Sequence, residues 1–76
     1  PQIEKRVGDK WSRVNMKDLQ VGDTFRMWIY HKKHMKWVLH EDDGGNTEWE
    51  TVSEPYIHNE YKVWTVNVKE EFGGLH

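Results

Sequence analysis

The sequence predicts a mainly β single domain, built as a small five-stranded SH3-like barrel or as a strongly bent antiparallel sheet. One observation is that no stretch of about ten residues carries the apolar period of a helix. A second is that short segments rich in β-branched and aromatic residues alternate with turn signals at intervals of about 8–12 residues. A third is the length of 76 residues, which suits one small domain with a thin core.

The β domain is predicted over residues 11–68. Residues 1–10 are polar apart from isolated apolar side chains, so we expect a flexible N-terminal arm. Residues 69–76 are charged and contain a Gly pair, so we expect a loose C-terminal tail. The chain has five Trp and no Cys, and the large apolar area of the rings is expected to replace disulfides in stabilising the core.

The first two strands are predicted on either side of a Gly22-Asp23 turn signal. Residues 11–14 are a short first strand. Residues 24–30 are the clearest strand in the chain, because β-formers alternate between two faces there. The apolar face is predicted to lie in the core and consists of Phe25, Met27 and Ile29. The opposite face consists of Arg26, Trp28 and Tyr30.

A charged tip over residues 31–34 is predicted to lead into a third strand over residues 35–40. Its inward side chains are expected to be Met35, Trp37 and Leu39. Residues 41–46 are the strongest turn signal, because their Gly pair accepts positive φ and their Asp and Asn side chains cap turns. Residues 47–52 are a fourth strand with Trp49 inward, and we predict that it pairs with the third strand as a hairpin.

The last predicted strand covers residues 61–68, after a loop over residues 53–60. Pro55 excludes a central strand from that loop, because proline has no backbone N–H to donate. Trp64, Val66 and Val68 are placed inward, and Tyr61, Val63 and Thr65 form a competing face. Three rings are therefore expected inside the domain, namely Trp37, Trp49 and Trp64, while Trp28 is the Trp most worth testing as a contact residue.

The residues that carry chemistry do not form a recognisable catalytic or metal site. No Ser lies in a nucleophile elbow, and Gly44-Gly45 lacks the Lys of a phosphate loop. His31 and His34 have no third ligand at a convincing spacing, so a zinc site is not predicted. We therefore expect no enzyme activity, no cofactor and no metal, and a function in binding.

Charge is distributed unevenly between the two halves of the chain. Residues 1–40 contain nine Lys or Arg and four Asp or Glu, whereas residues 41–76 contain two and nine. Such asymmetry either marks partner surfaces or means that basic and acidic strands pair within the fold. The acidic half predicts a surface that docks on a protein partner, formed by Glu48, Glu50, Glu54, Tyr56 and Ile57. Solubility is the alternative meaning of these carboxylates.

A basic and aromatic surface is the alternative binding site. Cations interleaved with rings suit single-stranded nucleic acid, through attraction to phosphates and stacking on bases. The residues predicted to form this surface are Arg26, Trp28, Tyr30, Lys32, Lys33 and Lys36. The net charge of −2 argues against a dedicated nucleic-acid binder. A protein partner is therefore favoured over nucleic acid, and the oligomeric state is left open.

One family resemblance accompanies these patterns. The element Leu19-x-x-Gly22-Asp23-x-Phe25-Arg26-Met27, followed by Trp49, Pro55-Tyr56 and residues 63–66, resembles small accessory proteins of tailed bacteriophages. The resemblance covers residues 11–68 and implies a short protein that engages host or phage machinery. It assigns no functional residue. A structural or assembly component of a phage is a further alternative.

The expected location is the cytoplasm, which is the host cell cytoplasm if a phage encodes the protein. The absence of Cys fits a reducing compartment. No apolar run approaches the roughly 20 residues that cross a bilayer, so no membrane partner is expected.

Overall fold

The computed structural model describes residues 1–70, and it is mainly β with antiparallel pairing. A single 3-10 turn interrupts the strands in this part of the chain. The elements are β1 (Gln2–Val7), β2 (Lys10–Val14), η1 (Met16–Asp18), β3 (Thr24–His31), β4 (Lys36–Leu39), β5 (Trp49–Glu50), β6 (Tyr56–Ile57) and β7 (Trp64–Thr65). Within residues 1–70, no helix is long and apolar enough to span a bilayer.

Strand β3 is the centre of the sheet. One of its edges pairs with β1, and β2 follows outside β1. Its other edge pairs with β4 over residues 28–31 and with β5 over residues 24–25. The pairings among residues 1–70 do not join β2 to β4 or β5, so they form an open sheet and not a closed barrel.

The flexible arm expected at the N-terminus is a wrong prediction for residues 2–7, which form the inner strand β1. This strand is paired on both sides, with β2 and with β3. Ile3 is only 8 % exposed, so an apolar side chain that looks isolated in the sequence is part of the core. Gly8 has φ 67 at the first position of the two-residue turn into β2, where glycine is favoured because it has no Cβ.

The predicted hairpin between residues 35–40 and 47–52 is also wrong. Strands β4 and β5 do not pair with each other, because both use the same edge of β3. The His40 N–H donates to the Met27 carbonyl at 2.8 Å, which completes the β4 ladder before the chain turns away. The turn at 41–46 forms as predicted, and the Asp42 side chain accepts the N–H groups of Gly44 and Asn46, each at 2.9 Å.

The last hairpin is divided by a bulge at residues 53–55. Below the bulge, the Lys69 N–H donates to the Glu50 carbonyl and the Val52 N–H to the Asn67 carbonyl, each at 2.9 Å. Above it, β6 pairs with β7 in a separate two-stranded sheet. The Ser53 hydroxyl oxygen accepts the Asn67 N–H at 2.9 Å, which replaces a backbone partner beside Pro55.

Two predictions for this hairpin need correction. The loop predicted over residues 53–60 contains β6, because Pro55 breaks the ladder for only a few residues and does not prevent pairing beyond them. The tail predicted over residues 69–76 begins with a residue that is hydrogen-bonded to Glu50. Residues 71–76 of that tail lie outside the described residues.

The core is small and lies where β1, β3 and the end of η1 meet. Its buried residues are Ile3, Leu19 and Phe25, and the half-buried side chains against them are Val14, Met16, Met27, Trp49, Val66 and Val68. The inward predictions for Phe25, Met27, Trp49, Val66 and Val68 are therefore confirmed. The inward predictions for Met35, Trp37 and Trp64 are wrong, since these side chains are 77 %, 44 % and 45 % exposed. Ile29 and Leu39, also predicted inward, are half-buried but lie outside the core cluster. The hairpins that carry them extend beyond the core. We call the core and the strand segments around it the hub.

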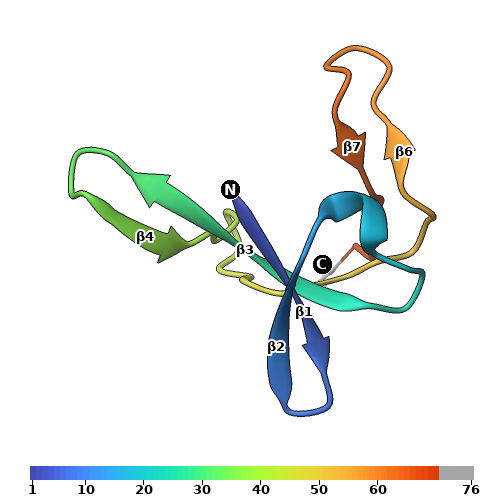
Figure 1. Ribbon diagram of the computed structural model, residues 1–76, viewed down its shortest axis with the longest axis horizontal. Helices are drawn as coiled ribbons and strands as arrows, with labels where there is room; N and C mark the ends of the chain where they lie inside the picture. The colour runs from blue at the N-terminus through green and yellow to red at the C-terminus, as the bar shows by residue number, and fades with distance from the viewer. Residues whose placement is uncertain (71–76) are drawn as a thin grey trace.

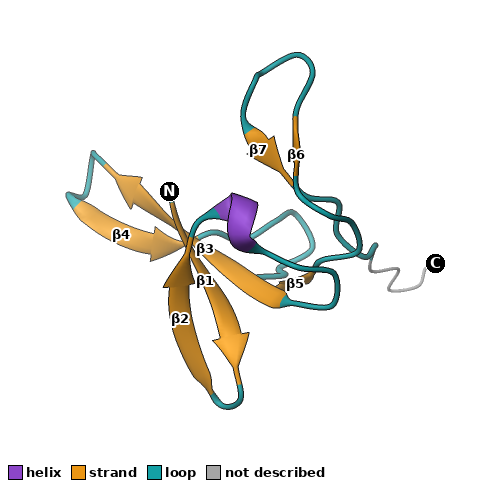
Figure 2. Cartoon of the chain, turned by 45° about the vertical axis from the view of Figure 1, so that its right-hand side comes forward, coloured by secondary structure: helices purple, strands orange, loops and turns teal. Residues whose placement is uncertain are grey.

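Three hairpins leave this hub in different directions, as Figure 1 shows. The first is β1–β2. The second is the outer end of β3–β4, residues 29–38, which we call the ribbon. The third is β6–β7 with its connecting loop, residues 56–65, which we call the arm. Figure 2 shows the same three directions after rotation, with the arm and the ribbon on different sides of η1. Besides the β1–β2 hairpin, the fold therefore presents the ribbon and the arm as two separate projections on one support.

Candidate functional site

The arm has a tip that is ordered by one histidine. The His58 N–H donates to the Val63 carbonyl at 2.8 Å, and the Lys62 N–H donates to the His58 carbonyl at 2.9 Å. In addition, His58 Nδ1 accepts the N–H groups of Glu60 and Tyr61 at 3.1 and 3.2 Å. The His58 ring also stacks on the Tyr61 ring, with centroids 4.8 Å apart. These contacts stabilise the turn at the tip of the arm.

The arm exposes large apolar side chains at a high density. Five of its residues are large, hydrophobic and between 39 % and 69 % exposed, namely Tyr56, Ile57, Tyr61, Val63 and Trp64. Exposed apolar residues scattered singly need no explanation, but a concentration of them is typical of an interaction site. Tyr and Trp are also the residue types that contribute most often to binding energy at protein interfaces.

Trp64 lies between two hollows at the base of the arm. One is a groove of about 340 Å³ that runs along the core and is lined by Phe25, Met27, His40, Trp49, Val66 and other side chains. The other is a hollow of about 630 Å³ beside η1 and the start of β1. Trp64 lines both, and its partner across the two-stranded sheet is Ile57. The exposed arm and the groove are therefore continuous through this ring.

The structure distributes the predicted acidic surface over two places. Tyr56 and Ile57 lie on the arm, and Glu54 precedes them in the bulge. Glu50 lies in β5 at the hub. Glu48 approaches Arg6 of β1, with Oε1 3.6 Å from the guanidinium nitrogen, so its charge is compensated within the fold. Pairing between the basic and acidic halves thus accounts for Glu48, and the arm retains the apolar part of the predicted surface.

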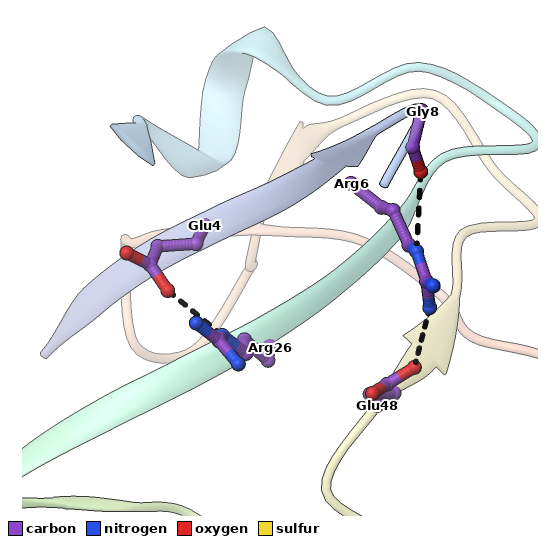
Figure 3. A network of polar contacts seen from close by, with 5 residues as sticks. All are labelled: Glu4, Arg6, Gly8, Arg26 and Glu48. Carbon is purple, nitrogen blue, oxygen red and sulfur yellow. Dashed lines mark hydrogen bonds and ion pairs between the residues drawn. The ribbon is translucent and has the colours of Figure 1, made fainter. Parts of the chain in front are cut away.

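A second ordered cluster lies on the sheet face opposite the core, around Glu4. One Glu4 carboxylate oxygen accepts the Arg26 Nε–H and the Trp28 Nε1–H, each at 2.8 Å. Figure 3 shows Glu4 of β1 facing Arg26 of β3, and the Arg6 guanidinium between the Gly8 carbonyl and Glu48. The Arg26 guanidinium also lies 4.2 Å from the centre of the Trp11 ring. The cluster joins β1, β2 and β3 by charge-assisted and cation–π contacts.

These contacts change the acidity of Glu4. The hydrogen bond from the Trp28 indole and then that from Arg26 hold the pKa of the Glu4 carboxyl below its ordinary value of 4.5. Both hydrogen bonds stabilise the charged carboxylate, and together they outweigh the partial burial, which would raise the pKa. The carboxylate is therefore the form that holds the face together near neutral pH.

The structure divides the predicted nucleic-acid surface at Trp28. Arg26 and Trp28 are bound to Glu4 at the hub. Tyr30 lies on the ribbon, where its ring meets the Trp37 ring edge to face at 5.4 Å. The remaining predicted residues lie at the ribbon tip and are Lys32, Lys33 and Lys36. The predicted basic and aromatic surface along β3 is thus divided into a charge-compensated cluster at the hub and a basic projection at the ribbon tip.

Several residues of both clusters escaped the sequence analysis. Glu4 and Trp11 were missed because their strands appeared too short or too polar to be central. Ile3 and Val7 fall on the same face of β1, but Lys5 lies between them on that face, so the apolar signal for this strand is weak. Trp64 was predicted inside because it alternates with Val66 and Val68 in the sequence. The bulge at residues 53–55 separates the pairing of Val68 with Thr51 from that of Trp64 with Ile57, and sequence alternation does not reveal it. Within residues 1–70, no three His, Asp or Glu side chains form a potential metal site.

Comparison of the chain with protein-family models, with curated proteins and with solved structures finds no match.

Proposed function

We propose that this chain is a non-enzymatic binding module that docks on a protein partner through the arm and the groove at its base. The observation that carries the proposal is the position of Trp64, which is 45 % exposed and lines both hollows. A large ring that the fold leaves open beside an apolar groove is well placed to anchor a partner side chain or segment.

The chemistry of the arm favours a partner with an apolar patch and a basic rim. Ile57 and Val63 supply aliphatic surface next to Trp64, and Glu54 and Glu60 flank them. The resemblance to small accessory proteins of tailed bacteriophages suggests that this partner belongs to host or phage machinery in the cytoplasm.

The SH3-like fold class is part of the same proposal, and short antiparallel strands around a small core support it. NMR contacts between β2 and β4 or β5 would reveal that the sheet closes into a barrel.

Two exposed Trp residues allow a matched test of the arm. Trp64 on the arm and Trp37 on the ribbon are 45 % and 44 % exposed, so their replacement removes similar accessible surface. Immobilised wild-type protein, Trp64→Ala and Trp37→Ala are incubated with host lysate, and the retained proteins are quantified by mass spectrometry. We expect a specific partner to be lost at least about tenfold with Trp64→Ala and kept with Trp37→Ala.

The proposal is contradicted if both variants lose the same proteins equally, or if neither loses any. Light scattering tests the assembly alternative in parallel. If the arm of one copy binds a second copy, wild-type protein forms oligomers that Trp64→Ala dissolves, and the partner is then the chain itself. If the protein is monomeric at all concentrations, the hypothesis that it is a structural or assembly component of a phage is weakened.

The alternative of single-stranded nucleic acid on the face of β3 is less well supported. Base stacking requires open ring faces, and phosphates require free cations. Arg26 is instead bound to Glu4 and lies against Trp11, while the Trp28 indole N–H is used by Glu4. The charge of this part of the face is therefore already compensated.

A further inference from the structure

The ribbon is a free-standing two-stranded projection. The pairing of β1 with β3 ends at Gln2 and Trp28, and within residues 1–70 the part of β3 beyond Trp28 pairs only with β4. Ile29 and Val38 face each other across the ribbon and belong to no part of the core cluster. Figure 1 shows the ribbon extending to the left of the hub, whereas the arm rises toward the upper right. Its shape is that of a slender antiparallel β-ribbon open on both faces.

The charge of the ribbon is positive and uncompensated. Residues 24–40 contain no Asp or Glu, although the whole chain contains 13 acidic residues. Three ion pairs join described residues, and they use Lys5, Arg6 and Arg26. Among residues 1–70, Lys32, Lys33 and Lys36 therefore have no acidic partner. Cations that the fold leaves free at the end of a projection favour an anionic partner.

The ribbon tip combines these cations with an exposed apolar side chain. The turn is closed by the His34 N–H to the His31 carbonyl and the Met35 N–H to the Lys32 carbonyl, each at 3.2 Å. The His31 and His34 rings stack with centroids 4.5 Å apart. Met35 has φ 54 and is 77 % exposed, so the tip presents a flexible apolar side chain between lysines.

We propose that the ribbon binds double-stranded nucleic acid by entering a groove, with Lys32, Lys33 and Lys36 against the flanking phosphates. A two-stranded β-ribbon fits the width of the major groove, and ribbons also enter the minor groove with apolar residues at the tip. A duplex is favoured over a single strand because the rings beside the ribbon are paired with each other or held by Glu4. This surface is separate from the arm.

A salt titration tests the proposal. Binding of a short fluorescent duplex is followed by anisotropy between about 50 and 200 mM salt, with a single strand of the same length beside it. Three phosphate contacts predict a slope of log K against log salt of about −2.7, which the variant Lys32→Gln/Lys33→Gln lowers to about −0.9. The matched control is Lys10→Gln/Lys17→Gln, which removes the same charge from β2 and η1 and is expected to keep the slope.

The four substituted lysines are exposed, so we expect both variants to fold like the wild type. Circular dichroism of all three proteins checks this. The proposal is overturned by any of three results: no duplex binding at the lowest salt, an equal change in slope for the control, or tighter binding of the single strand. Trp64→Ala is expected to bind the duplex like the wild type. A negative result in the capture experiment therefore leaves the proposal for the ribbon intact, and a negative result in the duplex titration leaves the proposal for the arm intact.

Discussion

The ribbon and the arm are both antiparallel hairpins that project from one hub, yet they differ in what they expose. The ribbon carries three lysines that have no acidic partner among residues 1–70 and contains no acidic residue itself, and the arm carries five large apolar side chains close together. Neither hairpin contributes much to the core. The difference shows that the backbone form of a hairpin does not determine what it exposes, because the ribbon presents three lysines among its rings and the arm presents mainly apolar side chains.

The two projections are also anchored differently. The ribbon continues from β3, which is paired on both edges and held by the Glu4 cluster. The arm is separated from the hub by the bulge at residues 53–55, and its own tip is held by His58. We therefore expect substitutions to affect the hub, the ribbon root and the arm separately, and the following changes test that division.

The largest effect is expected from Phe25→Ala in the hub. Phe25 is 3 % exposed and its ring packs 5.9 Å from the Trp49 ring, so its removal leaves a cavity in a core of very few residues. We expect a loss of about 3–5 kcal/mol in the free energy of unfolding, which would remove both proposed binding activities together. Chemical denaturation followed by circular dichroism measures it. Ile57→Ala is the exposed control, and similar losses for both variants would show that the hub is not the common support.

The next effect is expected from Glu4→Gln at the root of the ribbon. The change weakens the charge-assisted bonds to Arg26 and Trp28, and we expect a loss of about 1–2 kcal/mol in the free energy of unfolding. Glu54→Gln is the matched control on the arm side. Hydrogen exchange is expected to rise in β1 and β3 and to stay unchanged in β6 and β7. An equal rise in both hairpins would contradict separate anchoring.

The same residue predicts a pH dependence. The pKa of Glu4 is lower in the folded protein than its ordinary value of 4.5, so the unfolded chain takes up the proton first as the pH falls. The contribution of Glu4 to stability is complete above about pH 4.5 and is lost as the pH falls through the lowered pKa. Denaturation midpoints at pH 6 and pH 3 are therefore expected to differ more for the wild type than for Glu4→Gln.

A stabilising change is expected at Thr51 in the hub. Thr51 is fully buried, and its hydroxyl has no hydrogen-bond partner among residues 1–70. Thr51→Val replaces that hydroxyl by a methyl group of similar size and keeps the backbone bonds to Asp23 and Gly22. We expect a gain of about 1 kcal/mol, because an unpaired buried polar group is removed. A loss of stability instead would mean that the hydroxyl is satisfied in solution.

A smaller and local effect is expected at the arm tip. His58→Ala removes the Nδ1 acceptor of two backbone N–H groups, with an expected cost of about 0.5–1 kcal/mol confined to the arm. His58→Asn offers an oxygen in a similar place and is expected to restore the turn. Amide exchange at Glu60 and Tyr61 distinguishes the two variants, and equal exchange in both would show that His58 does not order the tip.

The smallest effect is expected from Lys32→Gln/Lys33→Gln, which is expected to change the free energy of unfolding by less than about 0.5 kcal/mol. Both lysines are exposed and have no ion-pair partner among residues 1–70. Thermal unfolding measures it. A larger change would mean that the ribbon tip stabilises the fold and is not reserved for a partner.

Much of the local structure was predictable from the sequence. Strands β2, β3 and β4 and the turns at 31–34 and 41–46 follow from alternation and turn residues, which are properties of neighbours in the chain. Of the residues predicted to bind a partner, Tyr56, Ile57 and the lysines of the ribbon are exposed. Glu48 and Arg26 are engaged within the fold, because residues far away in the chain supply their partners.

The sequence by itself determined that this protein is built from short strands and that residues 24–40 carry cations without any Asp or Glu. Only the tertiary structure decided that β1 is an inner strand, that β4 and β5 share one edge of β3, and that Trp37 and Trp64 lie outside the core. The physical reason is that strand pairing is a contact between distant segments, so a short strand carries no local signal of its partner. Which side chains remain free to bind follows from that pairing.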